Sequence, residues 1–183
     1  MASVTILGKE IQLEFRDDCD DAATVSSTSV ALAKMVDLIN NSSWDDSQAA
    51  AFRMMDKIVF FRGEVTVNGW RMSRPCCDEA QRTFYWSVGE FQQNSDADVH
   101  GNTFFHDCWH VVQYRNAGDK YPKDDNERVA REVDAINHQI DVAARLGCDE
   151  REISYLRGFR DSQQRIIARL DDGVQRGAAT QTA

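Results

Sequence analysis

The pattern of hydrophobic and polar residues predicts strands mainly in the first half of the chain. Residues 3–15 alternate between apolar and polar side chains, which is typical of a hairpin, and the apolar runs at 57–62 and 83–88 predict two further strands. Residues 65–72 predict a second hairpin, because the Asn68-Gly69 pair at its centre suits a type I′ turn.

Apolar residues at helical spacing predict helices in the rest of the chain. The expected segments are residues 29–40, 46–55, 103–116, 126–146 and a last helix from 149 onward. Asn102 or Thr103 is the expected N-cap of the third helix, and Gly147 ends the fourth. The polar segments 16–28 and 89–101 predict loops. Mixed strands and helices, followed by a helical C-terminal half, define an α+β fold.

Length, charge and cysteine content narrow the class of protein. A chain of 183 residues accommodates one domain, expected at residues 1–172, followed by a flexible tail at 173–183. The net charge of −9 argues against nucleic acid and membranes as partners, since both present negative charge. The sequence shows neither a signal-peptide pattern nor an apolar run of membrane-spanning length, so we expect a cytoplasmic location. Five cysteines without a CxxC motif argue against a disulfide framework.

The segment NTFFHDCWHVVQY, at residues 102–114, contains the most chemically informative residues. His106 and His110 are four residues apart, so on a helix they lie one turn apart and differ by about 40° in direction. Two imidazoles in this arrangement can chelate one metal ion. The core-facing side chains Phe105 and Trp109 lie beside the histidines rather than opposite them. We therefore expect the pair at the edge of the core, in a partly dry groove.

A third ligand is expected from the next long helix. Glu132 lies at the shoulder of the apolar stripe of that helix, which points its carboxylate towards the interior. Asp134 and His138 fall on the outer face of the same helix. A carboxylate beside a packed stripe needs a partner, which is either a metal ion or an arginine such as Arg128 or Arg131.

The run from His106 to His110 (HDCWH), followed 22 residues later by Glu132, resembles the zincin metallopeptidases, and the HVVQ and REVDA segments are also similar. In the gluzincin branch of that family, an HExxH motif on one helix and a glutamate on the next bind zinc. The resemblance implies that His106, His110 and Glu132 bind Zn²⁺ and that a twisted sheet packs over the HxxxH helix. It also implies a peptidase that hydrolyses amide bonds with a metal-bound water, and residues 83–88 are the candidate edge strand that aligns a peptide substrate.

Asp107 departs from the family's pattern, in which glutamate is the general base at this position. Its carboxylate reaches about 1–1.5 Å less far than that of glutamate. Asp107 is nevertheless the candidate catalytic residue, which orients or deprotonates the zinc-bound water. The alternative is a non-catalytic zincin-like module that binds a protein partner and has lost the general base.

Two further alternatives rank lower. The His106-Asp107 pair faintly resembles the secreted phospholipases A2, but the glycine-rich calcium loop of that family is missing. In the other alternative no metal binds, and the two histidines form a buried polar network with Glu132. The sequence gives no indication of the oligomeric state.

Other reactive side chains near this segment are assigned less direct roles. Cys108 points away from the histidines and is expected to be a buried thiol, while Cys76 and Cys77 are expected in a loop. His100 precedes the expected helix, which favours a solvated loop. His100 and Tyr114 are the candidates for stabilising an oxyanion.

Overall fold

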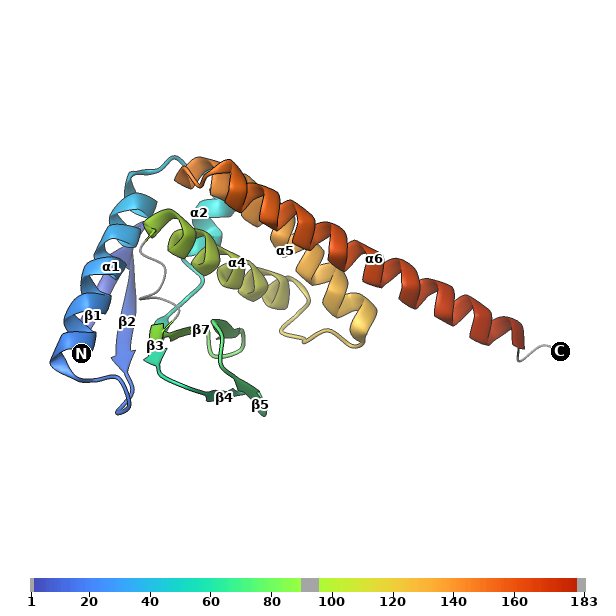
Figure 1. Cartoon of the computed structure of the whole chain (residues 1–183), viewed down its shortest axis with the longest axis horizontal. Coiled ribbons are helices and arrows are strands. Elements are labelled where there is room, and N and C mark those ends of the chain that lie inside the picture. Colours follow the sequence, from blue (N-terminus) through green and yellow to red (C-terminus); the bar gives the residue numbers. More distant parts are fainter. Residues whose placement is uncertain (1, 90–95, 181–183) are drawn as a thin grey trace.

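A computed structural model describes residues 2–89 and 96–180, with side chains described through residue 169 outside the same gap. Its first half contains a mixed sheet with helices packed on it, and its second half is helical (Figure 1). The α+β class predicted from the sequence is confirmed.

The main sheet is built from β1 (Ala2–Ile6), β2 (Lys9–Phe15), β3 (Lys57–Phe61), β7 (Thr83–Ser87) and β6 (Cys76–Asp78), in that spatial order. β1 and β2 form the predicted N-terminal hairpin. β2, β3 and β7 are parallel neighbours, and β6 pairs antiparallel with β7. The predicted Asn68-Gly69 hairpin is also present, as a separate sheet of β4 (Val65–Val67) and β5 (Trp70–Met72).

The helices are α1 (Ala22–Asn41), α2 (Asp46–Phe52), α4 (Ala97–Asn116), α5 (Asp125–Leu146) and α6 (Glu150–Thr180). At the start of several of them, an aspartate side chain accepts a hydrogen bond from one of the orphan backbone N–H groups. Asp21, Asp45 and Asp124 each accept a hydrogen bond from the backbone N–H three residues further on, at 2.8–2.9 Å. Gly147 ends α5 as predicted, with a left-handed φ of 84°.

Two helices begin earlier than the apolar pattern predicts. α1 starts at Ala22 rather than at residue 29, and α4 starts at Ala97 rather than at residue 102 or 103. The first turn of each helix is mainly small or polar, so hydrophobic periodicity does not mark it. The earlier start of α4 places His100 and Asn102 inside the helix.

One edge of the sheet is formed by β6 and not by β7. The sequence predicts residues 83–88 as the edge strand, and this prediction is wrong, because β7 pairs with β3 on one side and β6 on the other. β6 contains Cys76 and Cys77, which the sequence places in a loop. A strand of three residues is too short to show a period, so pairing with β7 is what defines it.

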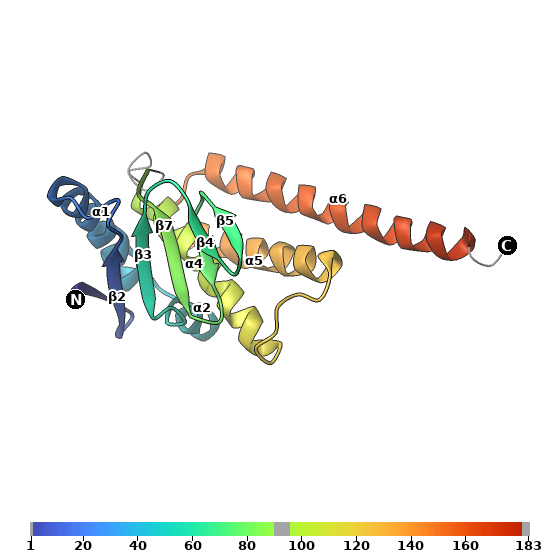
Figure 2. The ribbon, with the colours of Figure 1, turned by 90° about the horizontal axis from the view of Figure 1, so that it is seen from below.

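α4 lies against one face of the sheet (Figure 2), and an aromatic core holds it there. Phe60 of β3, Phe84 and Trp86 of β7, and Phe104 and Phe105 of α4 are all buried. The rings of Phe84 and Phe104 pack edge to face with centroids 5.4 Å apart. Burial of each such side chain contributes about 2–3 kcal/mol, so the rotation of α4 about its axis is strongly fixed.

α5 packs against both α4 and α6, and α6 runs back along α5 and continues beyond its N-terminal start (Figure 1). The flexible tail at residues 173–183 stays a prediction: α6 extends through Thr180, but side chains from residue 170 on and the whole of 181–183 lie outside the description. Residues 90–95 of the predicted loop at 89–101 lie outside it as well.

By length and composition, α1 is long and apolar enough to cross a membrane. Serine and threonine residues in its first half, and Lys34 and Asp37 in its second half, interrupt its apolar runs, so no continuous apolar run of membrane-spanning length marks it in the sequence. A third of its most apolar window is buried, and the helix packs on α4 and β1. A core helix and a signal sequence meet the same criteria, so the cytoplasmic location stays a prediction.

Candidate metal centre

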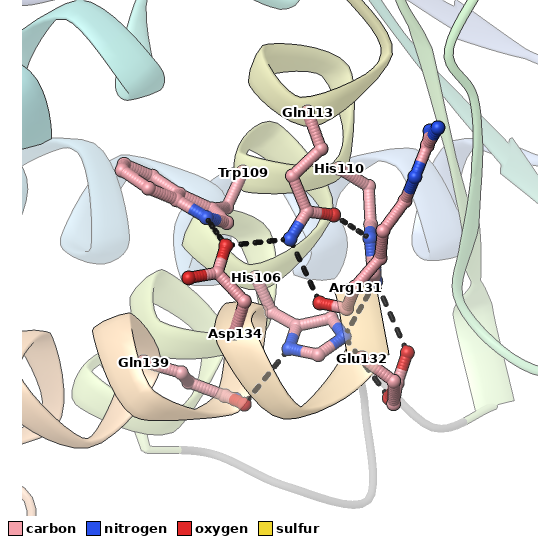
Figure 3. Close-up of polar contacts among 8 residues, drawn as sticks. All are labelled: His106, Trp109, His110, Gln113, Arg131, Glu132, Asp134 and Gln139. Carbon is pink, nitrogen blue, oxygen red and sulfur yellow. Dashed lines mark hydrogen bonds and ion pairs between the residues drawn. The ribbon is translucent and has the colours of Figure 1, made fainter. Parts of the chain in front are cut away.

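His106, His110 and Glu132 come together between α4 and α5 (Figure 3). On α4, Phe105 and Trp109 are buried and fix which face of the helix packs into the core. The two histidines then lie at the edge of that core. On α5, the buried apolar stripe fixes the rotation of the helix about its axis. Glu132 lies next to this stripe and therefore faces the histidines. The placement of all three residues agrees with the helical periodicity of the sequence.

The separations between the three side chains suit a tetrahedral metal site. The Nε2 atoms of His106 and His110 are 3.0 Å apart, and they lie 3.4 and 3.3 Å from the two carboxylate oxygens of Glu132. Ligands at about 2.0–2.1 Å from a zinc ion in a tetrahedral arrangement lie about 3.3 Å from one another. The group can therefore hold a metal ion with little rearrangement, and a fourth position is left for water or a substrate.

Two glutamines fix the orientation of the imidazole rings. Nδ1 of His106 is 3.0 Å from Oε1 of Gln139, and Nδ1 of His110 is 2.9 Å from Oε1 of Gln113. An amide oxygen only accepts hydrogen bonds, so each Nδ1 carries a proton and donates it. Each ring therefore directs its Nε2 atom at the other ligands. Nε2 is the nitrogen that a metal ion would bind at this position.

The amide of Gln113 is itself held in one orientation. Its Nε2 donates to the backbone carbonyl of Arg131 at 2.7 Å and to Oδ2 of Asp134 at 2.8 Å (Figure 3). The same oxygen of Asp134 accepts a hydrogen bond from Nε1 of Trp109 at 2.8 Å. Since both partners of Gln113 are acceptors, a flipped amide loses two hydrogen bonds, and the oxygen stays on His110.

Other polar side chains of α5 have partners that the sequence does not predict. His138, expected on a solvent-facing side, packs against the indole of Trp109 with ring centroids 3.7 Å apart and the ring planes tilted by 30°. Its Nε2 lies 3.7 Å from Oδ1 of Asp134. These contacts arise because α5 packs against both α4 and α6. The two neighbouring helices cover residues of α5 that lie outside its apolar stripe. Arg131 pairs with Glu127 at 2.6 Å rather than with the candidate ligand.

The charges of the candidate ligands stabilise one another. Burial by itself lowers the pKa of His110, but the hydrogen bond and negative charge of Glu132 raise it to about 9 on balance. Burial raises the pKa of Glu132, while hydrogen bonds from His106 and His110 outweigh burial and hold it well below its usual range. A metal ion at this position therefore competes with a proton on Nε2 of His110.

Asp107 lies beside the ligands and contacts β6. Its side chain is buried, and the thiol of Cys77 donates a hydrogen bond to it. Burial raises the pKa of Asp107, although the neighbouring charges of His106 and His110 act in the opposite direction. The carboxyl group is thus close to both the edge strand and the two imidazoles.

Glu79 is a further acidic residue near the site, and the sequence does not single it out. It follows β6 in the turn that leads to β7. Burial raises its pKa, and the charges of His110 and Asp107 act on it in opposite directions. Glu79 lies near α4 because β6 pairs with β7. No spacing of residues in the sequence signals this pairing.

A cavity of about 320 Å³ lies beside the candidate ligands. His106, Asp107 and Glu132 line one part of it, and Tyr155 and Phe159 of α6 line another. No sequence pattern connects α6 with the site, because the aromatic residues of this helix follow the same helical period as its core residues.

His100 belongs to this cavity and not to a solvated loop. It is buried in the first turn of α4, with its ring centroid 5.2 Å from that of Trp86. Tyr114, the other candidate for stabilising an oxyanion, packs against Tyr121 with ring centroids 5.0 Å apart. Cys108 is fully buried, which confirms the prediction for this thiol.

No protein-family model, curated protein or solved structure matches this chain. The resemblance to the zincins stays a prediction, and the functional interpretation depends on the geometry of the site itself.

Gln113→Leu is expected to weaken zinc binding about 10–100-fold, because the ring of His110 loses the acceptor that orients it. The measurement is the apparent dissociation constant for zinc in competition with a coloured chelator. Gln164→Leu, on the exposed side of α6, is the matched control and should leave the constant unchanged. Equal affinities for wild type and Gln113→Leu would show that this hydrogen bond does not prepare the site.

Proposed function

We propose that the protein is a zinc-dependent hydrolase of the peptidase type, which cleaves amide bonds in a peptide or protein substrate. The observation that carries this proposal is the convergence of His106, His110 and Glu132, whose ligand atoms lie within 4.8 Å of one another beside a cavity. Three protein ligands with an open fourth position are typical of catalytic rather than structural zinc. Zinc is the metal proposed, because two imidazoles and one carboxylate suit it at these separations.

A bound zinc ion supplies a Lewis acid that activates water and polarises a carbonyl group. His106, His110 and Glu132 hold the ion, and Gln113 and Gln139 keep the imidazole rings in place. This division of roles leaves the side of the site that faces the cavity for the substrate.

Proton transfer in this proposal is the task of Asp107. Its carboxylate accepts a proton from the attacking water and passes it to the leaving amine. The position beside His106 and His110, in the lining of the same cavity, supports this role. His100 lines the cavity as well and is our candidate to donate a hydrogen bond to the developing oxyanion.

A second candidate function is a non-catalytic module that holds a metal ion and binds a protein partner. The burial of Asp107 and its hydrogen bond to Cys77 favour this alternative, because they draw the short carboxyl group towards β6. The net charge of −9 suits a basic partner in that case.

The test is the metal content of protein purified without a histidine tag, followed by incubation with a mixed peptide library. We expect about one zinc ion per chain by inductively coupled plasma mass spectrometry. Cleavage, read by mass spectrometry, should stop after dialysis against a chelator and return when zinc is added. Bound zinc without any cleavage would support the binding module. Protein without zinc, and without a thermal shift on adding it, would leave only the metal-free polar network.

A further inference from the structure

We infer that the cavity beside the metal ligands takes a large apolar or aromatic side chain of the substrate, and that α6 supplies the wall that selects it. This inference rests on the proposed function, since it assigns a substrate class to the same site. The two can be tested separately, because binding to the cavity does not require hydrolysis.

The wall of the cavity on α6 is aromatic and accessible. Tyr155 is 66% exposed and Phe159 is 38% exposed, and both line the cavity. Their rings are parallel, with an interplanar angle of 7° and centroids 6.5 Å apart. Two accessible aromatic faces in one orientation offer a surface on which a flat or branched apolar group can pack.

The aromatic wall and the metal ligands belong to the same cavity. His106 and Glu132 line it from α4 and α5, while Tyr155 and Phe159 line it from α6. A ligand with one group at the metal can therefore place a neighbouring group on the α6 wall. A volume of about 320 Å³ is at the small end of ligand sites, which suits one substrate residue rather than an extended partner.

The position of Ile166 distinguishes two possible occupants of the cavity, a substrate side chain and a docking helix. Ile166 is 38% exposed, as Phe159 is, and lies on the same helix two turns further on. It does not line the cavity. A partner helix laid along α6 would contact both residues, whereas a side chain held beside the metal contacts only Phe159 and Tyr155. Phe159 and Ile166 are therefore a matched pair for mutation.

The experiment compares two hydroxamates, which chelate zinc through the same group, by isothermal titration calorimetry on the zinc-loaded full chain. Phenylalanine hydroxamate should bind about tenfold more tightly than alanine hydroxamate, because its phenyl group is removed from water against α6. Phe159→Ser and Tyr155→Ser should each reduce this preference to about threefold or less. Phe159→Leu should keep most of the preference, since the wall stays apolar, and Ile166→Ser should leave it unchanged.

Each outcome distinguishes the inference from the function on which it rests. Equal affinities of the two hydroxamates for the wild type would overturn the inference and leave the zinc site intact. A loss of preference in Ile166→Ser as large as in Phe159→Ser would also overturn it, because the effect would then belong to the whole helix. If neither hydroxamate binds, the zinc site fails and the inference fails with it. Melting temperatures of the variants show whether each one folds.

Discussion

His106→Ala is expected to remove both the bound zinc and the hydrolytic activity. The change deletes a ligand atom that lies 3.0 Å from Nε2 of His110 and 3.4 Å from Oε1 of Glu132. Two protein ligands remain, which is one fewer than catalytic zinc sites use. We expect zinc to fall from about one ion per chain to less than about 0.1 after gel filtration, and peptide cleavage to fall below detection.

His138→Ala is the matched control for this variant. His138 is also a histidine on a packed helix beside an acidic residue, with its Nε2 3.7 Å from Oδ1 of Asp134, but it is not part of the ligand group. The control should retain about one zinc ion per chain. Melting curves recorded in the presence of a chelator show whether either variant is destabilised apart from metal loss. Full zinc occupancy in folded His106→Ala would place the metal elsewhere in the chain.

The candidate ligands could be predicted from the sequence because their positions on the faces of α4 and α5 follow from helical periodicity. The i,i+4 spacing fixes His106 and His110 on one face wherever α4 lies, and the apolar stripe of α5 fixes Glu132 at its shoulder. The remaining requirement was that the two helices pack side by side, and a short connection between residues 117 and 124 favours that arrangement.

The surroundings of the site could not be predicted because they depend on which elements meet. The contact of Asp107 with Cys77 exists only because β6 pairs with β7 beside α4. The same holds for the α6 wall and for the contact of His138 with Trp109, since both result from helix packing rather than from spacing within one helix. The N-terminal starts of α1 and α4 were missed for a different reason, namely that a first turn of small or polar residues carries no apolar period.

Asp107→Asn is expected to keep the zinc and to lose hydrolysis by about 10²–10⁴-fold, because the amide cannot accept the proton of the attacking water. Asparagine has nearly the same shape, so its contact with Cys77 and the packing of α4 should survive. Retention of about one zinc ion per chain separates this loss from that in His106→Ala. The measurement is the rate of peptide cleavage, with metal content determined on the same samples.

Two further variants decide whether Asp107 is the base and whether the wild type is a hydrolase at all. Glu79→Gln changes a further acidic residue near the site, on whose pKa the charges of His110 and Asp107 act, and it should keep cleavage within about threefold of wild type. Loss of cleavage in Glu79→Gln but not in Asp107→Asn would move the base to Glu79. Asp107→Glu lengthens the side chain by one methylene group, so its carboxylate reaches about 1–1.5 Å further. Cleavage by this variant, with none by the wild type, would establish the alternative: a site that still holds its metal but whose shorter acid has turned a hydrolase into a binding module.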